Sequence, residues 1–474
     1  MSIVLRDYQR LGIDMVYDKF SNGFKNVIFW GQTGMGKSIC FTKMIQEGLA
    51  SGCCMVLVVR RKSLIDQASN HMIKNGISHG VHMANHKRYS PKKRVQICSI
   101  DTLASRKTYP HVEKKNVILI IDEAHDATPS ARKYASLIKE YSHCPIVGFT
   151  ATPFSNTSLW DAIVKPIEAH ELRDQGFLVP ETTFVPNIID TSKVRIKRNG
   201  EFDERELFEA SSNKKIIGDF VRDWIQKANN RKTILFAVNV EHSKMIAEVF
   251  NKAGIPAVHA DGTTKLSDRN RAIRKLLNGD IKVITNVNIF STGLDVPEIG
   301  CVQICRPTQS LIWHLQAIGR GLRTASGKTN CIIIDNAGNT LRHGGAYKVR
   351  EVELGKQKKR IIKDIDEDGD ISIRRCKRCS AVFEAKIQEC PECGFVNPKV
   401  KRRIDHEDGE LVQYEISEEE KQALIKSSFV SDYYKLSFVA NKRKFHKKWT
   451  YNKLEEKYGL TVCKQYGEIV GLKY

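Results

Sequence analysis

One stretch near the N-terminal end carries residues suited to holding the phosphate groups of a nucleotide. Gly31-Gln-Thr-Gly-Met-Gly-Lys-Ser38 fits the pattern G-x-x-x-x-G-K-[ST] and lies between an apolar run at 27–30 and a helical pattern at 37–50. Its glycines let backbone N–H groups curl around an anion, and the following helix adds positive potential. Lys37 is expected to reach the β- and γ-phosphates of ATP, and Ser38 to ligate Mg²⁺. The residues predicted to bind the nucleotide in this stretch are Gly31, Thr33, Gly34, Gly36, Lys37 and Ser38.

A pair of acidic residues supplies the second part of such a site. The apolar run 117–121 leads directly into Asp122-Glu-Ala-His125. A P-loop enzyme needs an acid that holds the Mg²⁺ shell, and we assign this role to Asp122. Glu123 would orient or deprotonate the attacking water. A chance glycine-rich turn and an ordinary acidic loop are the alternatives, and the joint presence of both motifs disfavours them.

Together the two motifs resemble those of superfamily 2 helicases and translocases of the DEAH-like type, with His125 rather than Asp in the fourth position of the acidic motif. Other segments match that family in the expected order. Residues 5–9 are similar to its adenine-recognising element, in which Gln9 would read the base edge and Arg6 would support it. Residues 59–64 and 99–103 resemble its first strand-contacting motifs, and 149–153 resembles the motif that couples hydrolysis to domain movement. The resemblance therefore implies nucleic-acid contacts for Arg60 and Thr102, and coupling roles for Thr150 and Thr152.

A further set of matching residues lies far along the chain. Gln316-Ala-Ile-Gly-Arg-Gly-Leu-Arg323 matches the family element Q-x-x-G-R-x-x-R, and a helix would place Gln316, Arg320 and Arg323 on one face. Two guanidinium groups there could stabilise charge that develops on the phosphates, whereas a solvated basic helix is the alternative. Residues 290–297 resemble the neighbouring family motif. That resemblance implies nucleotide contacts for Gly293 and Asp295 and a link to the nucleic acid for Thr292.

These residues must be positioned by the elements between them. Short apolar runs at 27–30, 55–59, 95–98, 117–121 and 146–149 are typical of buried parallel strands that alternate with helices. The pattern restarts with runs at 233–238, 281–285, 301–305 and 331–335 and helical stretches near 241–253, 268–278 and 310–318. We predict an α/β protein with two tandem RecA-like P-loop domains at 1–180 and 181–345. Residues 186–215 are interpreted as a polar connector, and 346–373 as a charged linker.

Four of the thirteen cysteines are clustered. Cys376-Lys-Arg-Cys379 and Cys390-Pro-Glu-Cys393 form two C-x₂-C pairs separated by ten residues. Two such knuckles complete a tetrahedral Cys₄ site, and the lack of an export signal disfavours disulfides. We therefore expect structural Zn²⁺ in a zinc ribbon at 374–398. With four protein ligands the site would be closed, without an open position for catalysis.

The remaining segment, 399–474, is expected to be a basic nucleic-acid-binding extension. Residues 441–451 interleave cations with aromatics, so Lys444 and Lys447 could contact phosphates and Trp449 could stack on an unpaired base. A basic amphipathic helix with locally packed aromatics is the alternative. A helicase core followed by a zinc ribbon and such a tail resembles RadD-like bacterial helicases and related phage recombination helicases.

Composition is consistent with a nucleic-acid partner. The 474 residues include 76 Lys+Arg and 54 Asp+Glu, which gives a net charge of +22. Such an excess attracts polyanions. A hydrophobic content of 41% excludes a largely disordered chain, and no apolar run approaches the length of about 20 residues that spans a bilayer. We expect a protein without membrane contact in the cytoplasm of a bacterium or a phage-infected host.

The leading hypothesis is an ATP-dependent DNA helicase or translocase that needs ATP, Mg²⁺ and Zn²⁺. It would unwind or branch-migrate single-stranded, forked or branched DNA in replication, recombination or repair, with partners such as a single-strand-binding protein. An RNA helicase is one alternative. A DNA-binding or strand-annealing protein with a regulatory ATPase is another. A motor fused to a nuclease is disfavoured, because no carboxylate cluster typical of a metal nuclease is recognisable outside the ATPase motifs.

Overall fold

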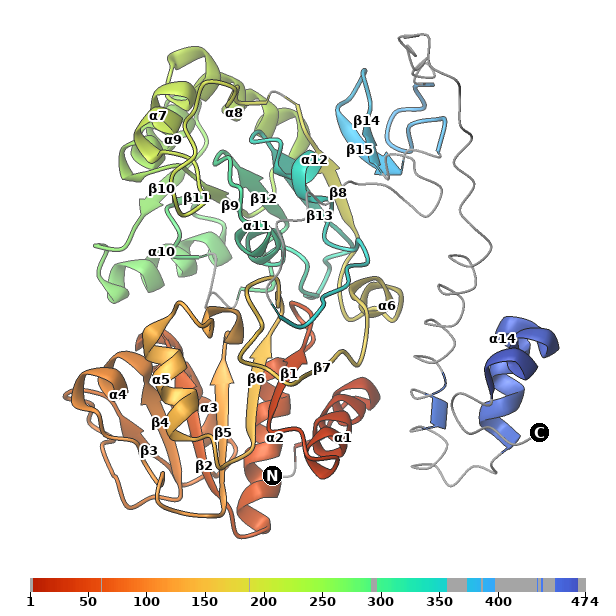
Figure 1. The fold of residues 1–474 in the computed structure, drawn as a ribbon. Coiled ribbons are helices and arrows are strands. Elements are labelled where there is room, and N and C mark those ends of the chain that lie inside the picture. Colours follow the sequence, from red (N-terminus) through yellow and green to blue (C-terminus); the bar gives the residue numbers. More distant parts are fainter. Residues whose placement is uncertain are drawn as a thin grey trace. The chain divides into compact units, whose positions relative to one another are not determined.

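The computed structural model describes residues 3–60, 62–186, 188–290, 296–355, 373–384, 387–396, 433, 436–437 and 448–467. The chain divides into two units, Met1–Pro398 and Lys399–Tyr474, and each is described by itself. Met1–Pro398 contains two sheets, built mainly from parallel strands, with helices packed around them (Figure 1). The prediction of an α/β fold with two RecA-like domains is confirmed.

The first domain is built on a seven-stranded parallel sheet in the order β3-β4-β2-β5-β6-β1-β7. Its strands are β1 (Asn26–Trp30), β2 (Cys54–Val59), β3 (Gly80–His82), β4 (Val95–Ser99), β5 (Val117–Asp122), β6 (Ile146–Thr150) and β7 (Ala162–Val164). Its helices are α1 (Asp7–Ser21), α2 (Lys37–Ala50), α3 (Lys62–Lys74), α4 (Ile100–Arg106) and α5 (Arg132–Glu140), and a short 3₁₀ helix, η1, covers Ala124–Asp126. Helices α1 to α3 pack on one face of the sheet, and α4 and α5 on the other.

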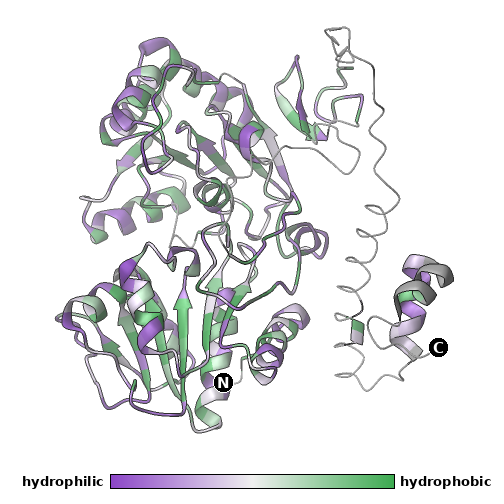
Figure 2. Ribbon diagram, in the orientation of Figure 1, coloured by the Kyte–Doolittle hydropathy of each residue, from purple (hydrophilic) through white to green (hydrophobic). Residues whose placement is uncertain are grey.

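Burial on both faces explains the continuous apolar strands, which are coloured green along most of their length in Figure 2. Phe29 and Phe149, on neighbouring strands, stack with ring centroids 4.7 Å apart, and Phe41 of α2 meets Phe149 edge-on at 5.8 Å. This packing holds the turn between β1 and α2 in place. The register pairs Trp30 with Thr150 and Phe149 with Asp122, so the ends of β1, β6 and β5 lie together at one sheet edge.

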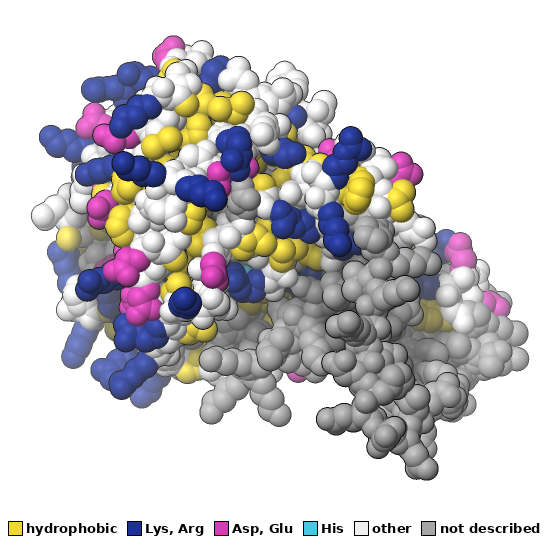
Figure 3. Space-filling model, turned by 90° about the horizontal axis from the view of Figure 1, so that it is seen from above, with side chains coloured by type: hydrophobic (Ala, Val, Ile, Leu, Met, Phe, Trp, Pro, Cys, Tyr) yellow, Lys and Arg dark blue, Asp and Glu magenta, His cyan; other side chains and the backbone are white. Residues whose placement is uncertain are grey.

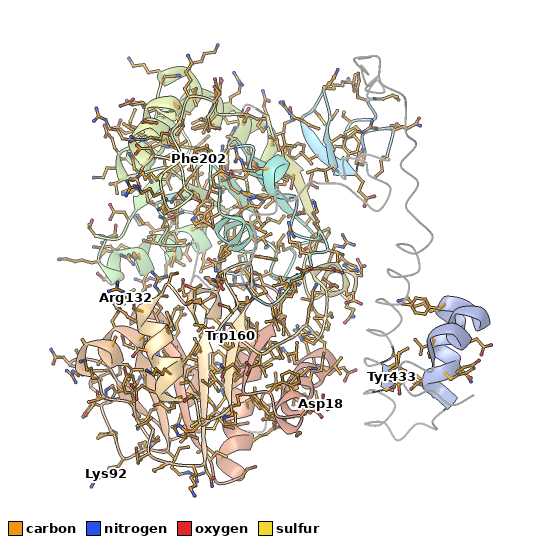
Figure 4. The ribbon with its side chains drawn as sticks, in the orientation of Figure 1. Asp18, Lys92, Arg132, Trp160, Phe202 and Tyr433 are labelled. Atoms are coloured by element: carbon orange, nitrogen blue, oxygen red, sulfur yellow. The ribbon has the colours of Figure 1, made fainter. Side chains whose placement is uncertain are left out.

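The second domain is built on an eight-stranded sheet in the order β10-β11-β9-β12-β13-β8-β15-β14. Its parallel strands are β8 (Glu181–Phe184), β9 (Thr233–Phe236), β10 (Ala257–Ala260), β11 (Val283–Asn286), β12 (Cys301–Ile304) and β13 (Cys331–Asp335). Its helices are α7 (Glu204–Ser211), α8 (Lys214–Lys227), α9 (Val240–Lys252), α10 (Leu266–Asn278), α11 (Leu311–Ile318) and α12 (Asn339–His343), while α6 (Ala169–Asp174) lies between the two sheets in sequence. Trp160 lies in the first domain and Phe202 in the second (Figure 4).

The interpretation of 186–215 as a connector is wrong for its second half. Residues from Glu204 form α7, and the segment also contains the start of α8. The side chain of Asp203 caps α7 by accepting hydrogen bonds from the backbone N–H groups of Arg205 and Glu206. The helix is short and buries mainly Leu207, so its polar composition concealed it.

An antiparallel hairpin completes the second sheet. It consists of β14 (Ile373–Arg375) and β15 (Ala381–Glu384), and β15 pairs antiparallel with β8 through Ala381 opposite Phe184. The backbone N–H of Val185 also donates to the carbonyl of Ser380 at 2.9 Å. The segment expected to be a separate zinc ribbon is therefore joined to the edge of the second domain.

The chain passes between the two domains twice. It leaves the first domain after β7, and residues 346–355, here called the strap, return to it. Lys165 Nζ donates to the carbonyl of Arg350 at 3.0 Å, and the N–H of Gly355 donates to Thr157 Oγ1 at 3.0 Å. Val352 packs against the apolar cluster beneath α4 and α5. The predicted linker 346–373 thus starts on the second domain, where the N–H of Ala346 donates to Glu181 Oε1, and reaches the first domain by Arg350.

In Lys399–Tyr474 the principal described element is α14 (Lys448–Gly467), which buries Leu454 and Cys463 with Tyr433 beside them. Figure 4 labels Tyr433 near this helix. Within the described part of the chain, none of the helices combines the length and apolarity that crossing a bilayer requires.

Candidate active site

The predicted phosphate-binding turn joins β1 to α2 and depends on two glycines. Gly34 and Gly36 both have φ of +86°, a conformation that disfavours L side chains, and Gly36 is the N-cap of α2. A Cβ atom at Gly36 would lie 2.6 Å from Gln9 Nε2. The turn is thus closely packed and directs backbone N–H groups toward the start of α2. Ser38 is exposed on the first turn of this helix, where an Mg²⁺ ligand is expected.

Gln9 connects α1 to this turn. Its side chain is 1% exposed, Nε2 donates to the carbonyl of Met35 at 2.8 Å, and Oε1 accepts from the N–H of Arg6 at 3.0 Å. The Arg6 guanidinium lies 4.1 Å from the ring centroid of Phe177 and donates to Tyr8 Oη at 2.8 Å. Gln9 therefore stabilises the phosphate turn through its hydrogen bond to Met35. Tyr8 and Phe177 are aromatic neighbours of Arg6 that could not be identified from the sequence.

Lys37 and the acidic pair form the charged centre of the site. Lys37 Nζ donates to the carbonyl of Gly31 at 3.2 Å. Burial lowers the pKa of Lys37, the carboxylates of Glu123 and Asp122 oppose that shift, and Arg320 and Arg323 add to it. All four of these charged side chains thus lie within electrostatic reach of Lys37, although Arg320 and Arg323 come from the second domain.

The surroundings of Asp122 disfavour its charged form. Its pKa is raised to about 7, mainly by burial and also by the Glu123 carboxylate, while Lys37 opposes the shift. A divalent cation would supply the positive charge that this buried carboxylate lacks, so the residues present fit Mg²⁺. The backbone N–H of Glu123 donates to Asp122 Oδ1 at 3.0 Å, which orients that carboxylate.

Glu123 has the backbone geometry of a constrained functional residue. Its φ is +52°, in the left-handed region that non-glycine residues rarely adopt. Its Oε2 atom is buried and accepts no hydrogen bond among the described residues, and His125 Nδ1 lies 3.4 Å away. An open carboxylate oxygen beside the phosphate turn suits the predicted role of orienting a water molecule.

The proposed row Gln316, Arg320 and Arg323 on one helix face is wrong. Helix α11 ends at Ile318, a turn follows, and Arg323 forms an isolated β-bridge with Leu178. Gly319 ends the helix, and a Cβ atom there would lie 2.5 Å from Thr33 Cγ2 of the phosphate turn. The glycine thus lets the two domains touch directly, and the turn brings both arginines to Lys37. Arg320 is 8% exposed, and its Nε donates to the carbonyl of Gln316 at 3.3 Å.

A hydrogen-bonded chain links the acidic motif to the predicted coupling residues. His125 Nδ1 lies 3.0 Å from Thr150 Oγ1, which accepts from the N–H of Thr152 at 3.0 Å. His125 Nε2 lies 3.5 Å from Gln316 Nε2 of the second domain. Sequence reasoning noted His125 only as a departure from Asp and missed its place between the domains. Its position beside Asp122 and Glu123 was the available signal.

The residues predicted to bind nucleic acid differ in their exposure and in where they lie. Arg60 is exposed at the end of β2 and is paired with Asp126 at 2.8 Å. Thr102 lies in α4 and is 7% exposed, so its side chain has little surface to offer. Trp449 lies in α14, in the other unit. The remaining predicted contacts with nucleotide or nucleic acid lie outside the described residues: Thr292, Gly293, Asp295, Lys444 and Lys447.

The four clustered cysteines converge as predicted for a metal ligand set. Their Sγ atoms all lie within 4.8 Å of one another, with Cys376 to Cys393 at 3.7 Å and Cys379 to Cys390 at 3.5 Å. A tetrahedral centre with Zn–S bonds of about 2.3 Å requires sulfur separations of about 3.8 Å. The geometry is therefore compatible with Zn²⁺. Cys376 and Cys390 are also buried in the apolar cluster beneath β8, which joins the ligand set to the second domain.

Comparison with known proteins agrees with this arrangement. Residues 2–155 match the family model described as the res subunit of type III restriction enzymes, and residues 214–325 match the helicase conserved C-terminal domain. A 51.5 kDa protein of a Lactococcus phage is 31% identical over 369 residues, which cover 76% of each chain. The protein named ATP-dependent helicase IRC3 of Saccharomyces cerevisiae is 29% identical, over 71% of this chain and 52% of the yeast protein. The mitochondrial ATP-dependent helicase irc3 of Schizosaccharomyces pombe is 28% identical, over 70% and 57%. The match thus spans little more than half the length of either yeast relative.

Two solved structures show the same fold at low sequence identity. The ATP-dependent type ISP restriction-modification enzyme LlaBIII, solved bound to DNA, superimposes with a TM-score of 0.54 and 17% identity, over 70% of this chain and 27% of that chain. A fragment described as an HsdR subunit of a type I restriction enzyme from Vibrio vulnificus gives a TM-score of 0.50 and 15% identity, over 72% and 66%. The two matching sequence domains, in this order around one nucleotide site, make the chain a member of the superfamily 2 helicases, which hydrolyse ATP.

Proposed function

We propose that the protein is a DNA helicase or translocase in which ATP closes the two domains and hydrolysis releases them. The observation that carries the proposal is that Gly319, directly before Arg320, packs against Thr33 of the phosphate turn, which brings the charges of Arg320 and Arg323 within reach of Lys37. A triphosphate held by Lys37 would attract both guanidinium groups. Closure of the domains would therefore depend on the γ-phosphate and be lost after hydrolysis.

In this proposal each side chain has one task. Ser38 and Asp122 would hold Mg²⁺, which neutralises phosphate charge. Glu123 would orient the attacking water, and Arg320 and Arg323 would stabilise charge that develops on the transferred phosphoryl group. Thr150 and Thr152 would transmit the change to the nucleic-acid contacts through His125. No covalent intermediate is needed, because positioning and charge stabilisation suffice for transfer to water.

DNA is the proposed polymer, and forked or branched DNA the proposed substrate. Support comes from the match of residues 2–155 to the res subunit of restriction enzymes and from the fold shared with LlaBIII, which was solved bound to DNA. The net charge of +22 suits any polyanion and does not separate DNA from RNA. We further propose that Cys376, Cys379, Cys390 and Cys393 bind structural Zn²⁺.

The test is a panel of ATPase assays with single-stranded DNA, duplex DNA, forks, four-way junctions and RNA as activators. Strand-displacement and junction-migration assays on the best activators should follow. We expect DNA to stimulate turnover more than RNA of the same sequence, and forks or junctions more than duplex. Stronger stimulation by RNA would favour an RNA helicase. Annealing without nucleic-acid-stimulated ATP turnover would favour a strand-annealing protein.

A further inference from the structure

A row of cations follows the free edge of the first sheet, outside the motifs discussed so far. Strand β3 is the last strand of this sheet, and the loop that follows it contains His86-Lys-Arg-Tyr-Ser-Pro-Lys-Lys-Arg94, here called the basic edge. This stretch of nine residues has five Lys or Arg and no Asp or Glu. Among the described residues, none of these five forms an ion pair, whereas Arg60 and Lys133 of the same domain are paired with carboxylates.

The backbone of the basic edge is fixed to the domain. The N–H of Val81 in β3 donates to the carbonyl of Arg88 at 2.9 Å, so the loop runs alongside the strand. Gln96 Nε2 donates to the carbonyls of Ser90, Pro91 and Lys93 at 2.9, 3.3 and 2.7 Å. A Cβ atom at Gly80 would lie 2.1 Å from the Ser90 carbonyl oxygen, which shows how closely the loop packs. The exposed side chains of Lys87, Lys92 and Lys93 therefore extend from a held backbone, whereas the Arg88 guanidinium donates to Ser69 Oγ and Asn70 Oδ1.

The C-terminal end of the basic edge, residues 92–94, borders a hollow in the surface. Lys92, Lys93 and Arg94 line a space of about 490 Å³ together with Gln46, Asn75 and Ser78. Arg94 is anchored by hydrogen bonds to the carbonyls of Leu49 and Cys53, both at 2.9 Å. Lys92 and Lys93 are exposed. Figure 4 shows Lys92 at the end of the first domain that points away from the second, whereas Arg132 lies at the end near it.

The arrangement favours an extended polyanion over a small anion. The cations are spread from the middle of β3 to the start of β4 rather than focused on one point. Tyr89 lies among them with 50% of its surface exposed, and its ring centroid is 5.9 Å from that of His82. Unpaired cations contact phosphates, and an exposed aromatic face can pack on a sugar or an unpaired base.

We infer that the basic edge is a second nucleic-acid-binding surface that holds the sugar–phosphate backbone outside the track formed by the helicase motifs. The inference rests on the proposed function, because it extends the binding of nucleic acid beyond that track. A fork or branch has an arm that the motor is not translocating along. The basic edge would bind such an arm through phosphate contacts and without sequence preference.

The test compares K87Q/K92Q/K93Q with a control of equal charge change, K139Q/K214Q/K215Q, which replaces exposed lysines on α5 and α8. Binding to a labelled fork is measured between 50 and 200 mM KCl. Each lost phosphate contact should reduce the slope of log K against log [salt] by about 0.9 on duplex and about 0.7 on single strands. We expect the edge variant to lose roughly two to three units of slope and bind about tenfold more weakly at 100 mM KCl, with unchanged ATPase activity in the absence of DNA.

An edge variant with the same slope and affinity as the control would overturn the inference and leave the proposed function intact. Binding of poly-glutamate that depends on Lys87, Lys92 and Lys93, with DNA binding unchanged, would assign the surface to an acidic protein and also overturn it. If the unaltered protein bound no nucleic acid, the proposed function itself would fail. Circular dichroism of all variants checks that the first domain remains folded.

Discussion

His125 and Gln316 meet at the boundary between the two domains, with His125 Nε2 and Gln316 Nε2 3.5 Å apart. An amide nitrogen only donates, so His125 Nε2 is the acceptor, and its Nδ1–H then donates to Thr150 Oγ1 at 3.0 Å. The His125 side chain therefore connects the second domain to the end of β6, which holds the coupling residue Thr150.

Gln316→Ala should weaken the communication between ATP hydrolysis and strand movement. The substitution removes the donor to His125 but no group that contacts phosphate, so we expect nucleotide affinity to change less than about threefold. DNA-stimulated kcat should fall about fivefold, since one hydrogen bond of this kind contributes on the order of 1 kcal/mol. Stimulated and basal ATPase rates provide the measurement. Gln309→Ala, shortly before α11, is the matched control, and equal loss in both variants would contradict the role of Gln316.

Arg323→Lys tests whether charge alone suffices across the domain boundary. Lysine keeps the positive charge but lacks the planar fork of donors, so ATP turnover should fall by roughly 10²-fold or more, while DNA binding stays within about threefold. Lys37→Ala should abolish turnover with the same retention of DNA binding. Steady-state ATPase assays and fluorescence anisotropy check both statements. Arg222→Lys, on the exposed side of α8, serves as the control, and full turnover by Lys37→Ala would refute the site.

Binding of Mg²⁺ should weaken as the pH falls through about 7. The buried Asp122 has its pKa raised to about 7 by burial and by the Glu123 carboxylate, and its proton must leave before the metal binds. Between pH 8 and pH 6 the Mg²⁺ concentration needed for half-maximal nucleotide binding should rise about tenfold. A fluorescent ATP analogue reports this binding without turnover.

Glu123→Gln separates the titration of Asp122 from that of the nucleotide phosphates. Removing the neighbouring negative charge lowers the pKa of Asp122, so the midpoint of the pH dependence should move to lower pH in this variant. The phosphates titrate identically in both proteins. An unchanged midpoint would show that Asp122 is not the group that controls metal binding.

Loss of the proposed Zn²⁺ should loosen the edge of the second sheet. Cys379→Ser removes one ligand of the four, and β15, which pairs with β8, is part of the same hairpin. We expect less than about a tenth of the wild-type metal content and a melting temperature lower by about 5 °C or more. The Val185 amide, which donates to the Ser380 carbonyl, should exchange faster with deuterium. Cys53→Ser, a free cysteine of the first domain, should change none of these.

Elements with strong local patterns could be predicted from the sequence. Helix α2 begins at Lys37 and ends at Ala50, as expected, because the glycine turn and the apolar periodicity both define it. The apolar runs at 95–98 and 117–121 become β4 and β5 because strands buried on both faces need uninterrupted hydrophobic residues. These elements alone place Lys37 and Asp122 at one edge of the first sheet.

Features that depend on distant contacts could not be predicted in this way. Strand β14 is Ile-Arg-Arg, which has no strand-like alternation, and the hairpin that contains it joins the sheet through the pairing of β15 with β8. The end of α11 at Ile318 is set by Gly319, whose contact with Thr33 comes from another domain. The sequence therefore predicts a helical spacing for Arg320 and Arg323, whereas the structure carries both guanidinium groups on the turn after α11.

The strap adds a mechanical consequence to this site. Because the polypeptide passes from the first domain to the second before β8 and returns through 346–355, two connections join the domains. Two connections restrict sliding and twisting more than a single one does. ATP hydrolysis would therefore drive mainly a rotation of one domain about the axis through both connections.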